Sequence, residues 1–433
     1  MLSAKDPTHG IEKYYHRLEN SADLDPLMDK IGDSKYVLLG EASHGTHEYY
    51  TWRARLSTRL IKEKGFSIIA VEGYWPDCYN INSWIKNYED APEDIYEVLK
   101  NFRRWPTWMW ANWEIAAFAT WLRDHNDKLP AQKKTGFYGL DVYCLWASME
   151  SIVDYLEKED PETAKLAREA VQCFEPFKAS DSYASVFSSS KSDCKREVVD
   201  LLQEVRKKAH SYDREEEAGL NAELNALVIA NAEKYYKAMA GFGEDSWNVR
   251  DRHMAETLDR LMKHHGEDAK VIVWEHNTHI GDARATDMAA DGLINLGQLV
   301  REKHHEEGVC LVGFGSYSGS VIAGKRWGAP MEKMKVPEAI RGSVEHLLHR
   351  ESPQNKHIIF DEDKRLKESF SKELGHRAIG VVYHPAHERG NYVPSQISDR
   401  YDAFLYIDKT RGLHPLKIHP HPELTPETYP FGI

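Results

Sequence analysis

The chain has 433 residues, 41% of them hydrophobic, so it is long enough for a full-sized core and has the composition of a folded protein. Its net charge of −13 argues against nucleic acid or an anionic membrane as a main partner, because those partners require clustered lysine and arginine. No segment approaches the roughly 18 uninterrupted apolar residues that a membrane-spanning helix needs.

The cysteines and the N-terminal residues indicate the compartment. The five cysteines are scattered, odd in number and without a CxxC pair, so they suit a reducing cytoplasm in which a thiol is a small buried hydrophobe. Residues 1–21 lack the apolar segment of a signal peptide and read as the start of an amphipathic helix. We therefore expect a cytoplasmic protein.

Short apolar runs rich in β-branched residues predict a series of buried strands, separated by helices with apolar residues at spacings of three and four. The early runs are almost continuous in hydrophobicity, which is typical of parallel strands covered on both faces. In chain order we expect a strand at 35–40, a helix at 48–64, a strand at 66–72, a helix at 113–125, a strand at 136–141, a helix at 146–157, and strands at 270–275, 309–315, 357–360, 378–383 and 403–407. This alternation predicts an α/β fold with a three-layer α/β/α core and a mostly parallel sheet.

Residues 161–263 differ from the rest because they contain no convincing strand and are dense in Ala, Glu, Lys and Leu. Their apolar residues fall on helical faces, for example Leu220, Leu224 and Leu227. We therefore predict a core formed by 1–157 and 268–433, with a helical insertion at 158–267. The serine-rich segment 181–193 is expected to form a mobile loop in the insertion.

Polar residues follow the first four predicted strands directly. Taken singly they have ordinary explanations, because a carboxylate after a strand often caps a helix and a lone histidine is usually structural. Ligands, however, bind outside the carboxyl ends of parallel strands, so these residues are predicted to meet at one rim. They are Glu41 and His44 after the first strand, Glu72 after the second, Asp141 after the third, and His276 and His279 after the fourth.

This set suits a hydrolase that activates water directly. An imidazole is a suitable general base near neutral pH, so His44 is the candidate base, oriented by Glu41 or Glu72. Arg53, on the following helix, is placed to bind the substrate carbonyl or the developing oxyanion, and His276 to act as a second acid/base or an oxyanion donor. The G-x-S-x-G signature of a nucleophilic serine is missing. Ser43 is the only serine in a suitable position.

Two further groups have open roles. Trp105, Trp108, Trp110 and Trp113 either line a pocket for a large apolar ligand or sugar, or pack helices against the sheet. We take Trp108, with His279 and Asp141, as a candidate substrate contact. His384 and His387 have ligand-like spacing but lie in a turn marked by proline and glycine, so their role stays open.

The motifs at the strand ends resemble the erythromycin esterase family. The resemblance is carried by residues 38–45 (LLGEASHG), Arg53, residues 71–73 (VEG) and residues 274–279 (WEHNTH), and the segment 246–256 is similar to the family's stretch before the last of these. It runs from about residue 30 to about residue 410, dense at the strand ends and thin in the insertion.

The resemblance implies a metal-independent ester hydrolase, without a cofactor, in which a histidine activates water to open a macrolactone. On this basis His44 is the base, and Glu41, Arg53, Glu72 and His276 complete the site. A small-molecule ester is the implied partner. The resemblance does not identify the substrate, because the insertion, which should shape the cleft, matches the family poorly.

Two other functions are compatible with the sequence. The six strand-end residues include ligand types that bind zinc or manganese, so a metal-dependent hydrolase is one alternative, although no H-E-x-x-H motif is present. Stoichiometric metal together with loss of activity on chelation would indicate it. A binding protein for a ligand such as haem is the other alternative, because fold alone does not settle function. A haem-binding protein would show a Soret band when haem is added.

Overall fold

The computed structural model describes residues 11–89, 91–178, 194–212, 217–239, 241 and 244–421. The chain forms two compact units: unit 1 comprises Met1–Ala70, Pro92–Gly136 and Ala269–Ile433, and unit 2 comprises Val71–Ala91 and Phe137–Asp268. The predicted division into a core and an insertion at 158–267 stays a prediction. In the described part of the chain, no helix combines the length and the apolar character needed to cross a membrane.

Unit 1 is built on a mixed, mostly parallel sheet. Its strands lie in the order β1 (His16–Arg17), β8 (Lys356–Ile359), β11 (Ala403–Lys409), β6 (Val309–Gly324), β2 (Tyr36–Leu39) and β5 (Val271–Trp274). The four strands from β11 to β5 are parallel to one another, whereas β8 and β1 run antiparallel at one edge. The last residues of β6 also pair antiparallel with β7 (Met331–Val336).

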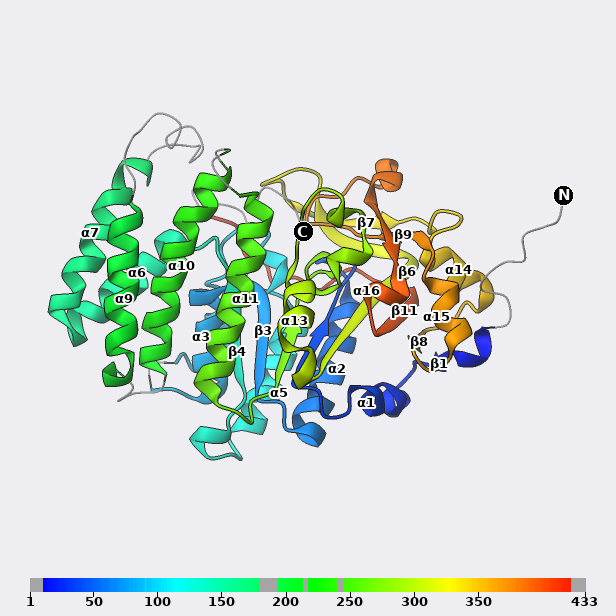
Figure 1. The fold of residues 1–433 in the computed structure, drawn as a ribbon, viewed down its shortest axis with the longest axis horizontal. Helices are drawn as coiled ribbons and strands as arrows, with labels where there is room; N and C mark the ends of the chain where they lie inside the picture. Colours follow the sequence, from blue (N-terminus) through cyan, green and yellow to red (C-terminus); the bar gives the residue numbers. More distant parts are fainter. Residues whose placement is uncertain are drawn as a thin grey trace. The chain divides into compact units, whose positions relative to one another are not determined.

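Helices cover both faces of this sheet (Figure 1). Tyr36 of β2 stacks on His304 of α13 (Leu296–His304), with ring centroids 4.4 Å apart. On the opposite face, the Nε1 of Trp274 donates to the Oγ of Ser57 in α2 (His47–Lys64) at 3.0 Å, and its ring stacks on Phe118 of α5 (Trp113–Asn126). The predicted three-layer α/β/α fold is confirmed.

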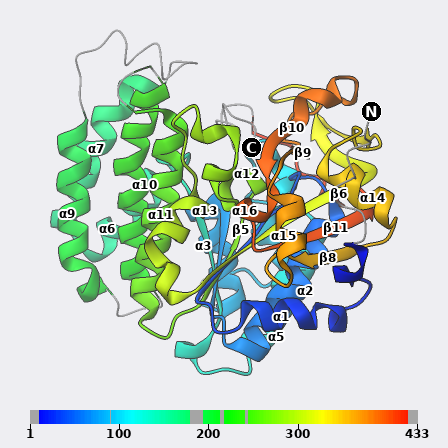
Figure 2. The ribbon, with the colours of Figure 1, turned by 45° about the vertical axis from the view of Figure 1, so that its right-hand side comes forward.

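Smaller elements complete unit 1. The helices are α1 (Asp25–Ile31), α4 (Ile95–Leu99), α12 (Asn277–Ile280), α14 (Val344–Glu351), α15 (Lys364–Phe370) and α16 (Ile397–Arg400). A separate antiparallel pair, β9 (Glu373–Arg377) and β10 (Tyr392–Gln396), is drawn in orange in Figure 2.

The strand predicted at 378–383 is wrong. The segment is apolar and buried, but its backbone makes only isolated bridges, from Ile379 to Ser43 and from Val382 to Gly324. Its side chains pack with those of β6 and β7 in a local core cluster that includes Ile379 and Tyr383. Burial therefore explains its hydrophobicity without a continuous strand.

The amphipathic helix predicted at the N-terminus is also wrong for the described residues. Glu12–Tyr14 form a single 3-10 turn, and His16–Arg17 form β1. The edge pairing of His16 with His357 and of Arg17 with Lys356 is a tertiary interaction that overrides the local helical pattern.

Unit 2 contains the later part of β3 (Ile68–Tyr74) and most of β4 (Gly136–Asp141), all buried. A Cβ at Gly139 would lie 2.4 Å from the carbonyl oxygen of Gly73, so the two strands approach closely at this glycine. The helices of the unit are α3 (Trp75–Lys86), α6 (Leu145–Glu159), α7 (Pro161–Lys178), α9 (Lys195–Tyr212), α10 (Ala218–Met239) and α11 (Ser246–His265). The predicted helical region is therefore present, and the serine-rich segment 181–193 lies outside the described residues.

A disulfide joins Cys173 of α7 to Cys194, just before α9. The expectation of free thiols is therefore wrong for this pair, because the two cysteines are 21 positions apart in sequence and give no local CxxC signal. Cys78, Cys144 and Cys310 are buried thiols that take part in no disulfide, as expected.

Candidate active site

The loop between β2 and α2 carries the histidine motif, and its two glycines are required by close packing. A Cβ at Gly40 would lie 2.0 Å from the Oδ1 of Asn277, and a Cβ at Gly45 would lie 1.8 Å from the carbonyl oxygen of Ile322. Only glycine permits these approaches. Because the glycines flank His44, they fix the path of the backbone on both sides of it.

Backbone hydrogen bonds hold the same loop in place. The carbonyl of Ala42 accepts the N–H of Ile379 at 2.8 Å, and the carbonyl of Gly45 accepts the N–H groups of Ile322 and Leu413, each at 3.0 Å. The Tyr50 hydroxyl donates to the His44 carbonyl at 3.2 Å. The histidine therefore projects from a rigid loop rather than from a free one.

His44 and Glu41 form a buried pair. The Nδ1 of His44 lies 2.9 Å from the Oε1 of Glu41, whose other oxygen accepts the Nη2 of Arg53 at 2.6 Å. An ionised carboxylate only accepts hydrogen bonds, so Nδ1 carries the imidazole proton and Nε2 keeps its lone pair. Within the described residues, this buried Nε2 has no hydrogen-bond partner.

Arg53 lies behind Glu41 and is fully buried. Its guanidinium sits 4.4 Å from the ring centroid of Tyr50 and 4.8 Å from that of Trp274, so cation–π contacts supplement the ion pair. The observed partner of Arg53 is thus the carboxylate that orients His44. Its predicted contact with a substrate carbonyl or oxyanion stays a prediction.

His276 faces His44 with the opposite hydrogen-bonding character. The two ring centroids are 5.0 Å apart. The Nδ1 of His276 caps α12 by accepting the N–H of Thr278 at 3.3 Å, which places the proton of the neutral ring on Nε2. One ring therefore offers an acceptor and the other a donor. His279, predicted to bind substrate, is buried in the same short helix, and its role stays a prediction.

Glu72 and Asp141 come together in unit 2, on Arg250. The Nη2 of Arg250 lies 2.6 Å from the Oε1 of Glu72, and Asp141 accepts from Nη2 and Nε at 2.8 and 3.1 Å. Burial lowers the pKa of Arg250, but the charges of Asp141 and Glu72 and the neighbouring Tyr143 outweigh it and raise this pKa above its ordinary value. The arginine is therefore permanently charged.

Arg250 was missed by the sequence analysis, although a signal was present. It lies three residues after Trp247 and four before Met254, which places a charged side chain on an apolar face of α11. A buried arginine requires an anionic partner, as does a buried Glu72. The partner could not be identified, because Glu72 is 178 residues away in sequence.

The tryptophan-rich segment is mostly interior to unit 1. Trp108 is buried and makes an edge-to-face contact with Trp105 at 5.4 Å, while Trp105 donates to the carbonyl of Ala329 at 2.7 Å. Trp110 is buried and Trp113 exposed. This favours packing for Trp105, and a substrate contact for Trp108 stays a prediction. His384 and His387, whose role was left open, are exposed.

Comparisons with known proteins agree with the resemblance noted in the motifs. The family model of erythromycin esterase matches residues 61–410, a range that begins after His44 and Arg53. Erythromycin esterase type II from Escherichia coli is 26% identical over 423 residues, which cover 92% of this chain and 95% of the relative.

Two solved structures share the fold. A crystal structure described as a succinoglycan biosynthesis protein has a TM-score of 0.75 and 20% identity. The match covers 96% of this chain and 99% of that protein's chain. A mutant of the erythromycin esterase EreC in its open conformation has a TM-score of 0.65 and 15% identity. The match covers 91% of this chain and 95% of that protein's chain.

Proposed function

Because the chain belongs to the erythromycin esterase family, and is therefore a hydrolase of the esterase type, we propose that it cleaves a carboxylic ester or lactone with water activated by His44. The supporting observation is the state of the His44 ring. Glu41 holds Nδ1 at 2.9 Å, while no described residue hydrogen-bonds to Nε2, although this nitrogen is buried. A buried acceptor without a partner is costly unless it serves a ligand.

In the proposed reaction, Nε2 of His44 takes a proton from water as the water oxygen attacks the ester carbonyl carbon. The carbonyl oxygen becomes an oxyanion in the tetrahedral intermediate. When the intermediate collapses, the bond to the alcohol oxygen breaks and the proton passes from His44 to that oxygen. The products are a carboxylic acid and an alcohol, or a hydroxy acid when the substrate is a lactone, and no covalent enzyme intermediate forms.

The neighbouring residues fit this cycle. Glu41 stabilises the imidazolium that forms transiently on His44, and Arg53 holds the Glu41 carboxylate in place, so both are positioning residues. The Nε2–H of His276 is suited to donate to the oxyanion. Glu72 stays a proposed member of the site on its sequence position and the family resemblance, and Asp141, His279 and Trp108 stay proposed members on their sequence positions alone.

The test is hydrolysis of a panel of aryl esters and macrolides by the wild type and by His44→Ala. We expect the variant to lose at least about 1,000-fold in kcat/KM on every ester that the wild type cleaves, because its general base is removed. Circular dichroism checks that the variant stays folded. Near-equal rates would show that His44 is not the base.

Ser43→Ala is the matched control from the same loop. The Ser43 hydroxyl bonds to the Thr46 hydroxyl and is not needed in the proposed cycle, so the variant should keep its activity. If Ser43→Ala loses activity and an acyl-enzyme can be trapped in the wild type, the nucleophile is a serine and not an activated water molecule. The panel also tests erythromycin as a substrate, which the names of the relatives suggest.

A further inference from the structure

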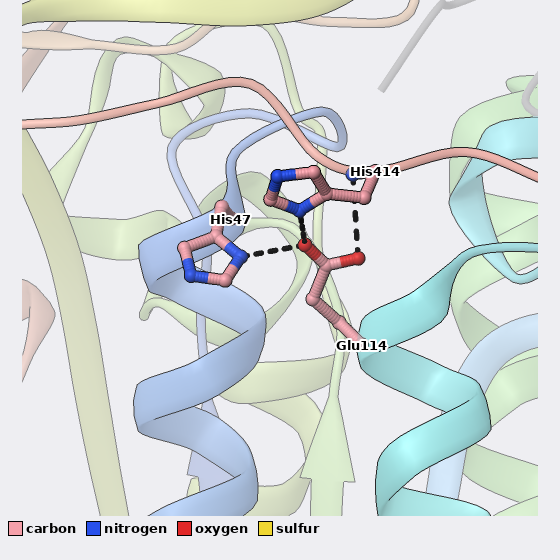
Figure 3. Close-up of side chains that lie close together, drawn as sticks. All are labelled: His47, Glu114 and His414. Atoms are coloured by element: carbon pink, nitrogen blue, oxygen red, sulfur yellow. Dashed lines mark hydrogen bonds and ion pairs between the residues drawn. The ribbon is translucent and has the colours of Figure 1, made fainter.

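A second histidine–carboxylate cluster lies in unit 1, outside the proposed reaction (Figure 3). His47 begins α2, Glu114 lies in the first turn of α5, and His414 belongs to the C-terminal segment. The Nδ1 atoms of His47 and His414 lie 2.6 and 2.7 Å from the same oxygen of Glu114. Ligand atoms from three distant segments thus converge at one point, all within 4.8 Å of one another.

The backbone holds these three segments together independently of the side chains. The N–H of Trp113 donates to the carbonyl of His414 at 3.0 Å, and the N–H of Leu416 donates to that of Ala111 at 2.9 Å. On the other side, the N–H of Leu413 bonds to the Gly45 carbonyl at 3.0 Å. The C-terminal segment therefore crosses the beginnings of α2 and α5, and the three side chains are brought together by the fold.

We propose that His47, Glu114 and His414 bind a divalent transition-metal cation of the zinc class, which ties the C-terminal segment to α2 and α5. Two imidazoles and one carboxylate are a ligand set that Zn²⁺ accepts, with water in the fourth position. Calcium and magnesium prefer oxygen ligands throughout. The site is separate from the chemistry proposed for His44.

The present geometry is that of a hydrogen-bonded trio, and a cation requires a modest expansion. With Zn–ligand bonds of about 2.0–2.1 Å, tetrahedral ligand atoms stand roughly 3.3 Å apart. The observed separations of 2.6 and 2.7 Å must therefore open by roughly 0.6 Å. The side chains of His47 and His414 are 21% and 58% exposed, whereas that of Glu114 is 4% exposed. The histidine rings can therefore rotate outward while the carboxylate stays fixed.

The electrostatics select the kind of cation. The Glu114 carboxylate is buried and accepts from both histidines through one oxygen. The positive ends of the α2 and α5 dipoles oppose any cation at this place. Binding must therefore come from coordinate bonds to nitrogen, which favours Zn²⁺ or Co²⁺ over ions held mainly by charge.

The experiment uses full-length protein dialysed against a chelator and then titrated with Co²⁺ or Zn²⁺. We expect visible d–d absorption from one Co²⁺ per chain, and a Zn²⁺-dependent rise in Tm, because a cation that binds only the folded state stabilises it. His414→Ala removes an exposed ligand without disturbing the core. It should weaken Co²⁺ binding at least tenfold, as should Glu114→Gln.

Two matched variants locate the site. His419→Ala removes another exposed histidine from the same segment and should bind Co²⁺ like the wild type. His44→Ala should also bind normally, which distinguishes this site from a metal held by the Glu41–His44 group. The proposal is overturned if Co²⁺ gives no d–d absorption, if Zn²⁺ leaves Tm unchanged, or if His414→Ala binds Co²⁺ as tightly as the wild type.

Discussion

Unit 1 and unit 2 each bury an arginine beside a carboxylate, but the number of carboxylates for each buried arginine differs. In unit 2, Arg250 takes both Glu72 and Asp141, one of them through two of its nitrogens. In unit 1, Arg53 shares the single carboxylate of Glu41 with His44, and the far nitrogen of His44 has no partner in the described chain. Burial of charge alone therefore does not identify a reactive group. The difference is that the group in unit 1 keeps atoms without a hydrogen-bond partner among the described residues, namely the Nε2 of His44 and the Nε and Nη1 of Arg53.

The largest expected effect on stability comes from breaking the cluster of unit 2. Arg250→Leu leaves Glu72 and Asp141 buried without their counter-charge, so the free energy of unfolding should fall by about 3–5 kcal/mol. Urea unfolding at pH 7 measures it. The matched control is Arg252→Leu, because Arg252 lies on the same helix but is 55% exposed and should change stability little. Equal effects of both variants would contradict a special role of the buried cluster.

Neutralising the carboxylate in unit 1 should affect the rate, and it should also cost stability because the buried Arg53 loses its counter-charge. In Glu41→Gln the amide can still accept from Nδ1 of His44, but it no longer stabilises an imidazolium. We expect kcat to fall by roughly 100-fold or more, about 3 kcal/mol in activation free energy, with KM little changed. Steady-state kinetics measure this split, with Glu63→Gln at the exposed end of α2 as control. An unchanged kcat would separate Glu41 from the reaction.

His357 sharpens the comparison because its buried ring also has unpartnered nitrogens within the described chain, yet it lies in strand β8, outside the His44 group. Burial, with a smaller effect of His16, lowers the pKa of His357 to about 3. Between pH 3 and the pKa of an unfolded histidine near 6.5, His357 is protonated in the unfolded chain but neutral in the folded chain. The free energy of unfolding is therefore lost as pH falls through this window.

His357→Leu removes that titration. Between pH 7 and pH 5 the variant should lose about 2 kcal/mol less stability than the wild type, and its ester hydrolysis at pH 7 should be unchanged. Urea unfolding at the two pH values measures the first part. An identical pH dependence would mean that His357 is not held neutral. If His357→Leu lost ester hydrolysis, His357 would also take part in the reaction, and a buried nitrogen without a partner would be enough to identify a functional histidine.

Much of the fold could be predicted because its signals are local. The helix predicted at 48–64 is α2, and the strand predicted at 136–141 is β4. Strand β7 was not predicted, since half of its sequence MEKMKV is charged and exposed, and pairing with the end of β6 makes it a strand. The apolar segment 378–383 shows the reverse error. The hydrophobicity of a segment indicates that it is buried. Whether the segment forms a strand depends on hydrogen bonds to a backbone segment that is distant in sequence.

The same limit applies to the site. His44 and Glu41 lie three residues apart, so their pairing was within reach of the motif. The bond between Glu41 and Arg53 was not predicted, because the spacing in sequence does not say which face of α2 turns toward the loop. The structure brings two of the six predicted strand-end residues, Glu72 and Asp141, together on Arg250, which comes from a distant helix and was not predicted.

Gly40 and Gly45 have a consequence for how this family is recognised and mutated. Any side chain at either position collides with Asn277 or with the backbone of Ile322, so a selection for activity would score both glycines as severely as His44. Such a scan would count four important positions in a six-residue motif, Glu41 included, of which the two glycines only keep the loop foldable. A parallel abundance measurement separates them: glycine variants should disappear from the soluble pool, and His44 variants should accumulate as inert protein.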